Sequence, residues 1–158
     1  MSSNGLLHDG IRYWARRSPE KAAVVLDDEP PLDYATLERW SDGIAARLQT
    51  MGVVPGDRVA IAAANCLAWP AVAVAVLKTG AIIAPMNDRL LGDELAYLAG
   101  YSEPRVIGAD DARRALIEGA GVTVPILPLE TVEGDRGGAD AGWAPVRVDS
   151  ESVALIMF

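Results

Sequence analysis

Residues 56–91 read GDRVAIAAANCLAWPAVAVAVLKTGAIIAPMNDRLL, and this stretch decides the fold. Two apolar runs, Val59–Ala64 and Ala81–Met86, read as strands, with an apolar helix between them. Gly80, just after Lys78, suits the end of that helix. Strands that are apolar throughout, without alternation, are typical of parallel sheets covered on both faces. We therefore predict a layered α/β fold with a mainly parallel sheet flanked by helices.

Two other interpretations of this stretch are a membrane span and a longer strand. Val59–Leu77 has only Asn65 as a clearly polar side chain and is long enough to cross a bilayer. Against this, Asn65 stands where a strand would end, and Pro70 lies near the first turn of the next element, where a missing N–H costs little. The alternation at residues 71–76 would also suit a strand, but the glycine stop and the apolar run after it favour a helix. We expect no transmembrane segment.

The same alternation of elements extends through the chain, whose 158 residues fit a single α/β region over 1–158. Predicted helices are Asp9–Arg17, a helix capped by Asp33 and ended by Gly52, Asp93–Gly100, and one from Asp110 or Asp111 to Glu118; further predicted strands are Ala22–Leu26, Arg105–Gly108 and Val124–Leu129. Residues 130–152 mix glycine and proline with charges, which predicts a surface loop or linker.

The last six residues, Val153–Phe158, form an apolar run that suits a central buried strand. Such a run is unusual at the end of a domain, because termini of complete domains are usually exposed and polar. We therefore expect the chain to be truncated at the carboxyl end of a strand, where ligands of open parallel sheets bind.

Composition excludes several classes of function. The formal net charge is -8, and no segment gathers lysine and arginine, which argues against nucleic acid as a partner. Cys66 is the only cysteine, and the first residues lack the pattern of a secretory signal. We expect a cytoplasmic protein.

Few side chains suggest chemistry. Cys66 follows a strand as some nucleophiles do, but the only histidine, His8, lies far away in the sequence, so a structural cysteine is the better interpretation. Asn87 and Arg89 follow the strand Ala81–Met86, which is a legitimate ligand position, although a turn and a surface ion pair explain them as well.

Two tryptophans and a glycine-rich segment are best explained by structural roles and not by ligand binding. Trp14 and Trp40 fall on apolar helix faces, which predicts core or interface side chains. The glycine-rich segment Gly134–Gly142 lacks the spacing of a phosphate-binding loop.

Three segments resemble a known family. They are LDYATLERWSDGIAARLQTMGVVPGDRVAIAAAN at 32–65, LKTGAIIAPMNDRLLGDELAYLAGYSEPRVIGAD at 77–110 and DSESVALIMF at 149–158. Together they resemble the amino-terminal portion of the adenylate-forming, AMP-binding acyl-CoA synthetase superfamily. In that family a strand like Val153–Phe158 leads into a phosphate-binding loop, and that loop is not in this sequence.

The resemblance implies a two-step ligase in the full-length protein. A carboxylic acid, expected to be a fatty acid, would react with ATP and Mg²⁺ to give an acyl-adenylate, and coenzyme A would then displace AMP. The family residues that do this lie beyond Phe158, so we assign no catalytic, cofactor-binding or metal residue and expect the chain alone to be inactive scaffold. Homo-oligomerisation is left open.

Two alternatives stay open beside the acyl-CoA synthetase. One is an adenylating ligase that acts on a carrier-protein thiol. The other is a non-catalytic α/β module that ends at Phe158 and binds or assembles through its last strand. A dinucleotide-dependent hydride-transfer enzyme is a weaker rival, because no glycine-rich turn follows Val59–Ala64.

Overall fold

A computed structural model describes residues 6–27, 29–136 and 142–158. Its helices are α1 (Leu7–Arg17), α2 (Tyr34–Thr50), α3 (Ala68–Lys78), α4 (Gly92–Ser102), α5 (Asp111–Gly119) and α6 (Leu129–Gly134). Its strands are β1 (Ala22–Val24), β2 (Leu32–Asp33), β3 (Arg58–Ala62), β4 (Ile82–Met86), β5 (Val106–Ala109) and β6 (Ile126–Pro128).

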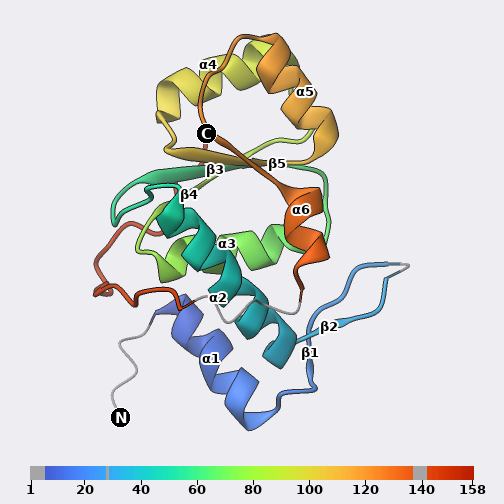
Figure 1. The fold of residues 1–158 in the computed structure, drawn as a ribbon, viewed down its shortest axis with the longest axis vertical. Coiled ribbons are helices and arrows are strands. Elements are labelled where there is room, and N and C mark those ends of the chain that lie inside the picture. Colours follow the sequence, from blue (N-terminus) through green and yellow to red (C-terminus); the bar gives the residue numbers. More distant parts are fainter. Residues whose placement is uncertain (1–5, 28, 137–141) are drawn as a thin grey trace.

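A parallel sheet of four strands lies at the centre, in the order β4-β3-β5-β6. Helices α4 and α5 cover one face, and α2, α3 and α6 lie on the other (Figure 1). Helix α1 and the β1–β2 hairpin lie beyond α2, away from the sheet (Figure 1). The predicted layered α/β fold with a parallel sheet is confirmed.

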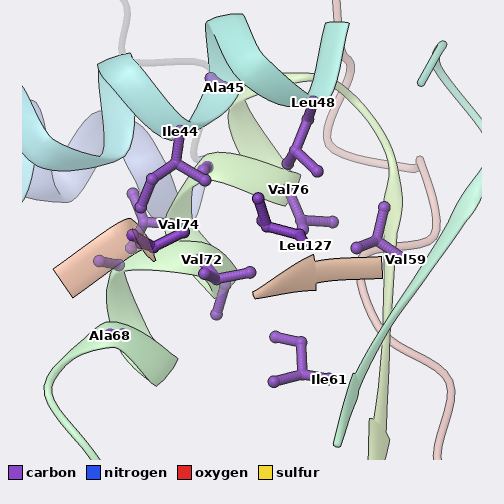
Figure 2. Packing of buried hydrophobic residues seen from close by; sticks show 14 of the residues in the cluster. Ile44, Ala45, Leu48, Val59, Ile61, Ala68, Val72, Val74, Val76 and Leu127 are labelled. Atoms are coloured by element: carbon purple, nitrogen blue, oxygen red, sulfur yellow. The ribbon is translucent and has the colours of Figure 1, made fainter. Parts of the chain in front are cut away.

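Strand β3 shows why the central run is apolar without alternation. Val59 and Ile61 pack into the larger core cluster with α2 and α3, while Ala60 and Ala62 pack into a second cluster with α4 and α5. Figure 2 shows the larger cluster, with Ile61 on the side of Val72 of α3 and the α2 side chains Ile44 and Leu48 on the opposite side of the cluster. Because alternate residues face opposite layers and both layers are helical, every position of the strand after Arg58 is buried.

The apolar run is divided between two elements, which removes the basis for the membrane interpretation. Its first part is β3 and its second part is α3, and nine of the eleven residues of α3 are buried inside the domain. Within the described residues, none of the helices combines the length and the apolar character that a membrane crossing requires.

Two short elements were not predicted. Strand β2 pairs antiparallel with β1, with Ala22 opposite Asp33 and Val24 opposite Leu32, so the strand predicted over Ala22–Leu26 is the shorter first arm of a hairpin. Helix α6 occupies the beginning of the range 130–152, which was predicted as loop. Residues 142–149 of that range carry no helix or strand, and residues 137–141 lie outside the described residues.

The expectation of a buried final strand is wrong within these residues. The segment Val153–Phe158 lies next to β4 and pairs with it through a single parallel bridge between Leu155 and Ile83. The amide of Ile83 donates to the Ala154 carbonyl over 2.9 Å, and the amide of Ile156 donates to the Ile83 carbonyl over 2.9 Å. No described strand lies outside this segment, so Met157 is 78% exposed and Phe158 is 50% exposed.

A buried cation joins α2 to α3. The Lys78 ammonium, 1% exposed as a residue, donates to Glu38 Oε2 over 2.9 Å, to Asp42 Oδ1 over 2.7 Å and to Ser41 Oγ over 2.9 Å. The three acceptors lie within one turn of α2, and the lysine is the last residue of α3. A buried ammonium with three close acceptors satisfies the requirement that buried charges be paired and hydrogen-bonded.

Replacing Lys78 by methionine should destabilise the protein strongly. The change keeps the side-chain length but leaves Asp42 without its cation and Glu38 with only Arg12, and removing one partner of a buried pair costs roughly 3 to 5 kcal/mol. Urea unfolding followed by tryptophan fluorescence measures the loss. The matched control is Arg114→Gln, which removes an exposed pair with Asp111 and should change stability by less than about 0.5 kcal/mol. Equal stabilities of the two variants would contradict this account.

Candidate functional site

The carboxyl ends of the parallel strands form the natural site of this fold. From β3, helix α3 leads across one face of the sheet to β4 on one side, and from β5, helix α5 leads across the other face to β6 on the opposite side. The chain therefore leaves β3 and β5 in opposite directions, which makes this edge a topological switch point. Ligands of open α/β sheets bind outside such carboxyl ends.

A shallow cleft of about 400 Å³ opens at this edge beside β4. It is lined by Ala63, Asn65, Trp69, Pro85, Met86, Asn87, Asp88, Met157 and Phe158. Three segments contribute: the loop after β3 with the start of α3, the end of β4 with its following turn, and the last two residues. Its polar side chains are two amides and one carboxylate, so the cleft as lined here carries no positive charge that would hold a phosphate.

The structure separates the two residues predicted as ligand candidates. Asn87 lines the cleft, and its Oδ1 accepts a hydrogen bond from the Arg89 amide over 3.0 Å, which closes a local turn. Arg89 is exposed and is not part of the lining. A ligand role for Asn87 stays a prediction, and its turn role is the one that the geometry supports.

A carboxylate and a guanidinium that the sequence analysis did not single out hold this edge together. Asp110, directly after β5, accepts from the Ala64 amide over 2.9 Å through Oδ2 and from the Arg113 amide over 2.9 Å through Oδ1. The side chain of Arg113 donates to Asp110 Oδ2 over 3.1 Å and to the Asp88 carbonyl over 2.7 Å. Two residues on one helix start therefore bind the segments that follow β3 and β4.

Asp110 and Arg113 together position two walls of the cleft. The loop that contains Ala64 and Asn65 forms one wall, and the turn that contains Asn87 and Asp88 forms the other. Asp110 also caps α5, so a local helix signal hides its longer-range contacts. The signal in the sequence was an aspartate at the helix start, Asp110, followed three residues later by Arg113. This signal predicts a helix cap and an ion pair, but not the hydrogen bonds to Ala64 and Asp88.

Cys66 and His8 do not form a pair. Cys66 lies in the loop before α3, whereas His8 lines a separate cleft with Leu77 and Ala81, at the other end of the same helix. An eleven-residue helix is about 16 Å long, which separates the two groups. Burial raises the pKa of the Cys66 thiol, so it is uncharged and a poor nucleophile at neutral pH.

The two tryptophans have structural contacts. Trp40 is 1% exposed, and its Nε1 donates to the Val132 carbonyl over 2.8 Å, which ties α2 to α6. Trp14 is partly exposed and lies beside Tyr34, with their ring centres 6.2 Å apart. These contacts confirm the core interpretation for Trp40. Most of the segment Gly134–Gly142 lies outside the described residues.

No group of three or more histidine, cysteine, aspartate or glutamate side chains that could hold a metal ion occurs within the described ranges. The Mg²⁺ ion that the resemblance implies therefore does not fit a ligand set within these ranges, and we derive no step through it.

The fold and the edge cleft place the chain among three-layer α/β domains built on a parallel sheet. The sequence matches the family described as AMP-binding enzyme over residues 11–158, so the chain belongs to this family of adenylate-forming enzymes. The match covers all of the parallel sheet and both of its helical layers.

Relatives and solved structures agree with this assignment. Malpibaldin synthetase of Mortierella alpina is 36% identical over 127 residues, which are 80% of this chain and 2% of that protein. The fatty acid--[acyl-carrier-protein] ligase ScoC of Streptomyces coeruleorubidus is 27% identical over 139 residues, which are 88% of this chain and 26% of that protein. The chain thus spans a small part of these relatives.

The structural likeness extends over almost the whole chain. A fatty acyl CoA synthetase of Mycobacterium tuberculosis superimposes with a TM-score of 0.82 at 22% identity, over 95% of this chain and 32% of that one. The N-terminal domain of FACL13 from the same organism gives a TM-score of 0.83 at 21% identity, over 99% and 41%. At these identities the likeness shows the fold, which is that of the N-terminal part of adenylating ligases.

Replacing Asp110 by alanine should make the segments that follow β3 and β4 more mobile. The change leaves the Ala64 and Arg113 amides without their acceptor and removes a helix cap, which together cost roughly 1 to 2 kcal/mol. Hydrogen exchange measured by mass spectrometry should accelerate in the peptides that contain Ala64 and Asp88. The matched control is Asp111→Ala, since the Asp111 carboxylate pairs with Arg114 and with no other cation in the described part of the chain. Unchanged exchange in Asp110→Ala, or equal acceleration in the control, would count against a role of Asp110 in positioning these two segments.

His8 should make stability depend on pH. Burial is the main cause that lowers the pKa of the imidazole below its ordinary value of 6.5; the Asp9 carboxylate opposes this shift, and the Arg12 and Lys78 cations add to it. The unfolded chain then takes up a proton at higher pH than the folded chain does, so the free energy of unfolding should fall as pH drops below 6.5.

Urea unfolding between about pH 7 and about pH 5 tests this expectation. His8→Gln should reduce the slope, and no second histidine exists to mask the effect. The same slope in both proteins would refute a depressed pKa for this imidazole.

Proposed function

We propose that the protein containing this chain activates a carboxylic acid with ATP and transfers the acyl group to coenzyme A. The observation that carries the proposal is membership of the AMP-binding family over residues 11–158. Use of ATP follows from the family. The activity belongs to the whole protein, because the chain spans a small part of the relatives and structures that it matches.

The proposed reaction has two steps. A carboxylate oxygen of the acid attacks the α-phosphorus of ATP, the bond from that phosphorus to the bridging oxygen breaks, and pyrophosphate leaves. A thiolate then attacks the acyl carbonyl, and AMP leaves with the oxygen that had joined it to the acyl group. Mg²⁺, when bound, would offset the negative charge on the phosphates.

The residues of this chain contribute a framework to that reaction. Strand β3 and its neighbours set the carboxyl edge, and Asp110 and Arg113 hold the walls of the cleft there. We propose that the segment Val153–Phe158, parallel to β4 at this edge, leads into the phosphate-binding loop of the whole protein. The lining of the cleft includes no cationic side chain, which supports the view that the groups holding the phosphates come from outside these 158 residues.

A carrier-protein thiol is the second candidate acceptor. One relative is named as a fatty acid--[acyl-carrier-protein] ligase, and others are peptide synthetases. This observation favours an acceptor thiol on a protein, whereas the motif resemblance favours coenzyme A. Both candidates share the first step and differ only in which thiol displaces AMP.

Exchange of labelled pyrophosphate into ATP tests the first step. With a panel of carboxylic acids, the whole protein should catalyse exchange that depends on one class of acid. Absence of exchange with every acid, under conditions where a known adenylating enzyme is active, would sink the proposal. Release of AMP on adding coenzyme A, or on adding a thiol-bearing carrier protein instead, then decides between the two acceptors.

The 158 residues alone provide the control. They should neither catalyse exchange nor bind ATP tightly, because their edge cleft has no cationic lining. Micromolar binding of ATP to this chain, measured by calorimetry, would show that it holds phosphate-binding groups which this account has missed.

A further inference from the structure

A groove between α1 and α2 collects positive charge on an otherwise acidic chain. It has a volume of about 340 Å³. It shares no lining residue with the cleft at the carboxyl edge. Its lining residues are Arg12, Ala15, Arg16, Ala35, Glu38, Arg39 and Asp42.

Helical spacing explains why the groove exists. The lining positions of α1 are three and four residues apart, and so are those of α2, so each set lies along one stripe of its helix. Ala15 and Ala35 contribute only methyl groups, which leaves space between the helices that larger side chains would fill. The longer side chains of Arg16 and Arg39 stand on opposite walls, one from each helix, and both residues are exposed.

The carboxylates in the groove are already neutralised. Glu38 accepts from Arg12 Nε over 3.0 Å and from the Lys78 ammonium over 2.9 Å. Asp42 accepts from the same ammonium over 2.7 Å. Lys78 is buried beneath them, so its charge is not available to a ligand but cancels charge in the groove.

Arg16 and Arg39 are the lining arginines without an ion pair among the described residues. Neither forms an ion pair with a carboxylate in the described part of the chain, and the Arg39 guanidinium donates only to Thr36 Oγ1, over 3.3 Å. Three arginines and two carboxylates line the groove, and the Asp33 carboxylate lies near enough to Arg39 to interact with it electrostatically, although the chain as a whole carries a formal charge of -8. Guanidinium groups pair carboxylates through two parallel hydrogen bonds, which suits them to acidic side chains.

The surroundings favour a protein over other anions. Tyr13, 56% exposed, lies three and four residues before Arg16 and Arg17 on α1, and tyrosine with arginine is enriched at the energetic centres of protein interfaces. A nucleic acid carries one phosphate charge on every nucleotide, so the net charge of the chain repels it more strongly than it repels a short acidic segment. The groove is shallow, as the edge cleft is, but its arginines come from two facing helices, which suits side chains that project from a partner better than a flat membrane surface.

We propose that the groove between α1 and α2 docks an acidic segment of a partner protein, whose aspartate or glutamate side chains pair with Arg16 and Arg39 while Tyr13 packs beside them. This site is independent of the adenylation proposed above, because none of its residues lines the edge cleft. Electrostatic complementarity of this kind raises association rates and selects partners.

Fluorescence anisotropy with a labelled glutamate-rich peptide tests the proposal on the whole protein. The peptide should bind, and raising the salt concentration from low to physiological should weaken the binding. Arg16→Gln combined with Arg39→Gln should weaken it by roughly tenfold or more, since two charge-assisted contacts are lost. Thermal unfolding should be almost unchanged, because neither arginine is ion-paired, so a folding defect does not explain the loss.

Arg89→Gln is the matched control. It removes one exposed arginine that lies at the carboxyl edge and also lacks a described carboxylate partner, and it should leave peptide binding unchanged. No measurable binding by the wild-type protein, unchanged binding in the double variant, or an equal loss in Arg89→Gln would overturn the proposal. Binding of anionic vesicles or single-stranded DNA that the double variant loses, without binding of the acidic peptide, would overturn it in favour of those partners.

Discussion

Strand β3 is hydrogen-bonded along both edges and covered on both faces, and the rest of the structure depends on this constraint. Its register places Ala60 opposite Ala84 of β4 and Ile107 of β5, so one strand positions the other two. Since parallel neighbours require crossover connections, α3 and α4 must pass over the two faces. The layers, the two core clusters and the common carboxyl edge all follow from where this strand lies.

The same constraint separates framework from chemistry. A strand that is apolar on both faces offers no functional side chain within the sheet, so polar groups can gather only at its ends. There Asp110 and Arg113 use their hydrogen bonds to hold backbone, and the cleft that they shape is lined without positive charge. The arginines without an ion pair lie instead between α1 and α2, away from the carboxyl edge of the parallel sheet. In this domain, the residues that position backbone segments therefore lie at the carboxyl edge, and the exposed arginines lie on another surface.

The long helices and strands could be predicted from the sequence because their apolar residues form patterns within each element. Asp33 was predicted as a cap, and its Oδ1 accepts from the Thr36 amide over 2.7 Å. Helix α6 was missed because its six residues are too few to show a period, and β2 was missed because two residues cannot show alternation. The final strand was predicted as buried from composition alone, yet burial of an apolar run depends on neighbours, and within the described residues it has β4 on one side and no strand on the other.

For this protein the sequence by itself determined the fold class, the order of its major elements and the family resemblance, because apolar periodicity and turn residues act over a few positions. It also predicted that Cys66 and His8 are structural, and that Trp40 is part of the core. Only the tertiary structure decided that Lys78 is buried between two carboxylates, that Arg113 reaches the carbonyl after β4, and that arginines of two helices share a groove. These contacts join residues far apart in sequence, and their geometry exists only once the layers have packed.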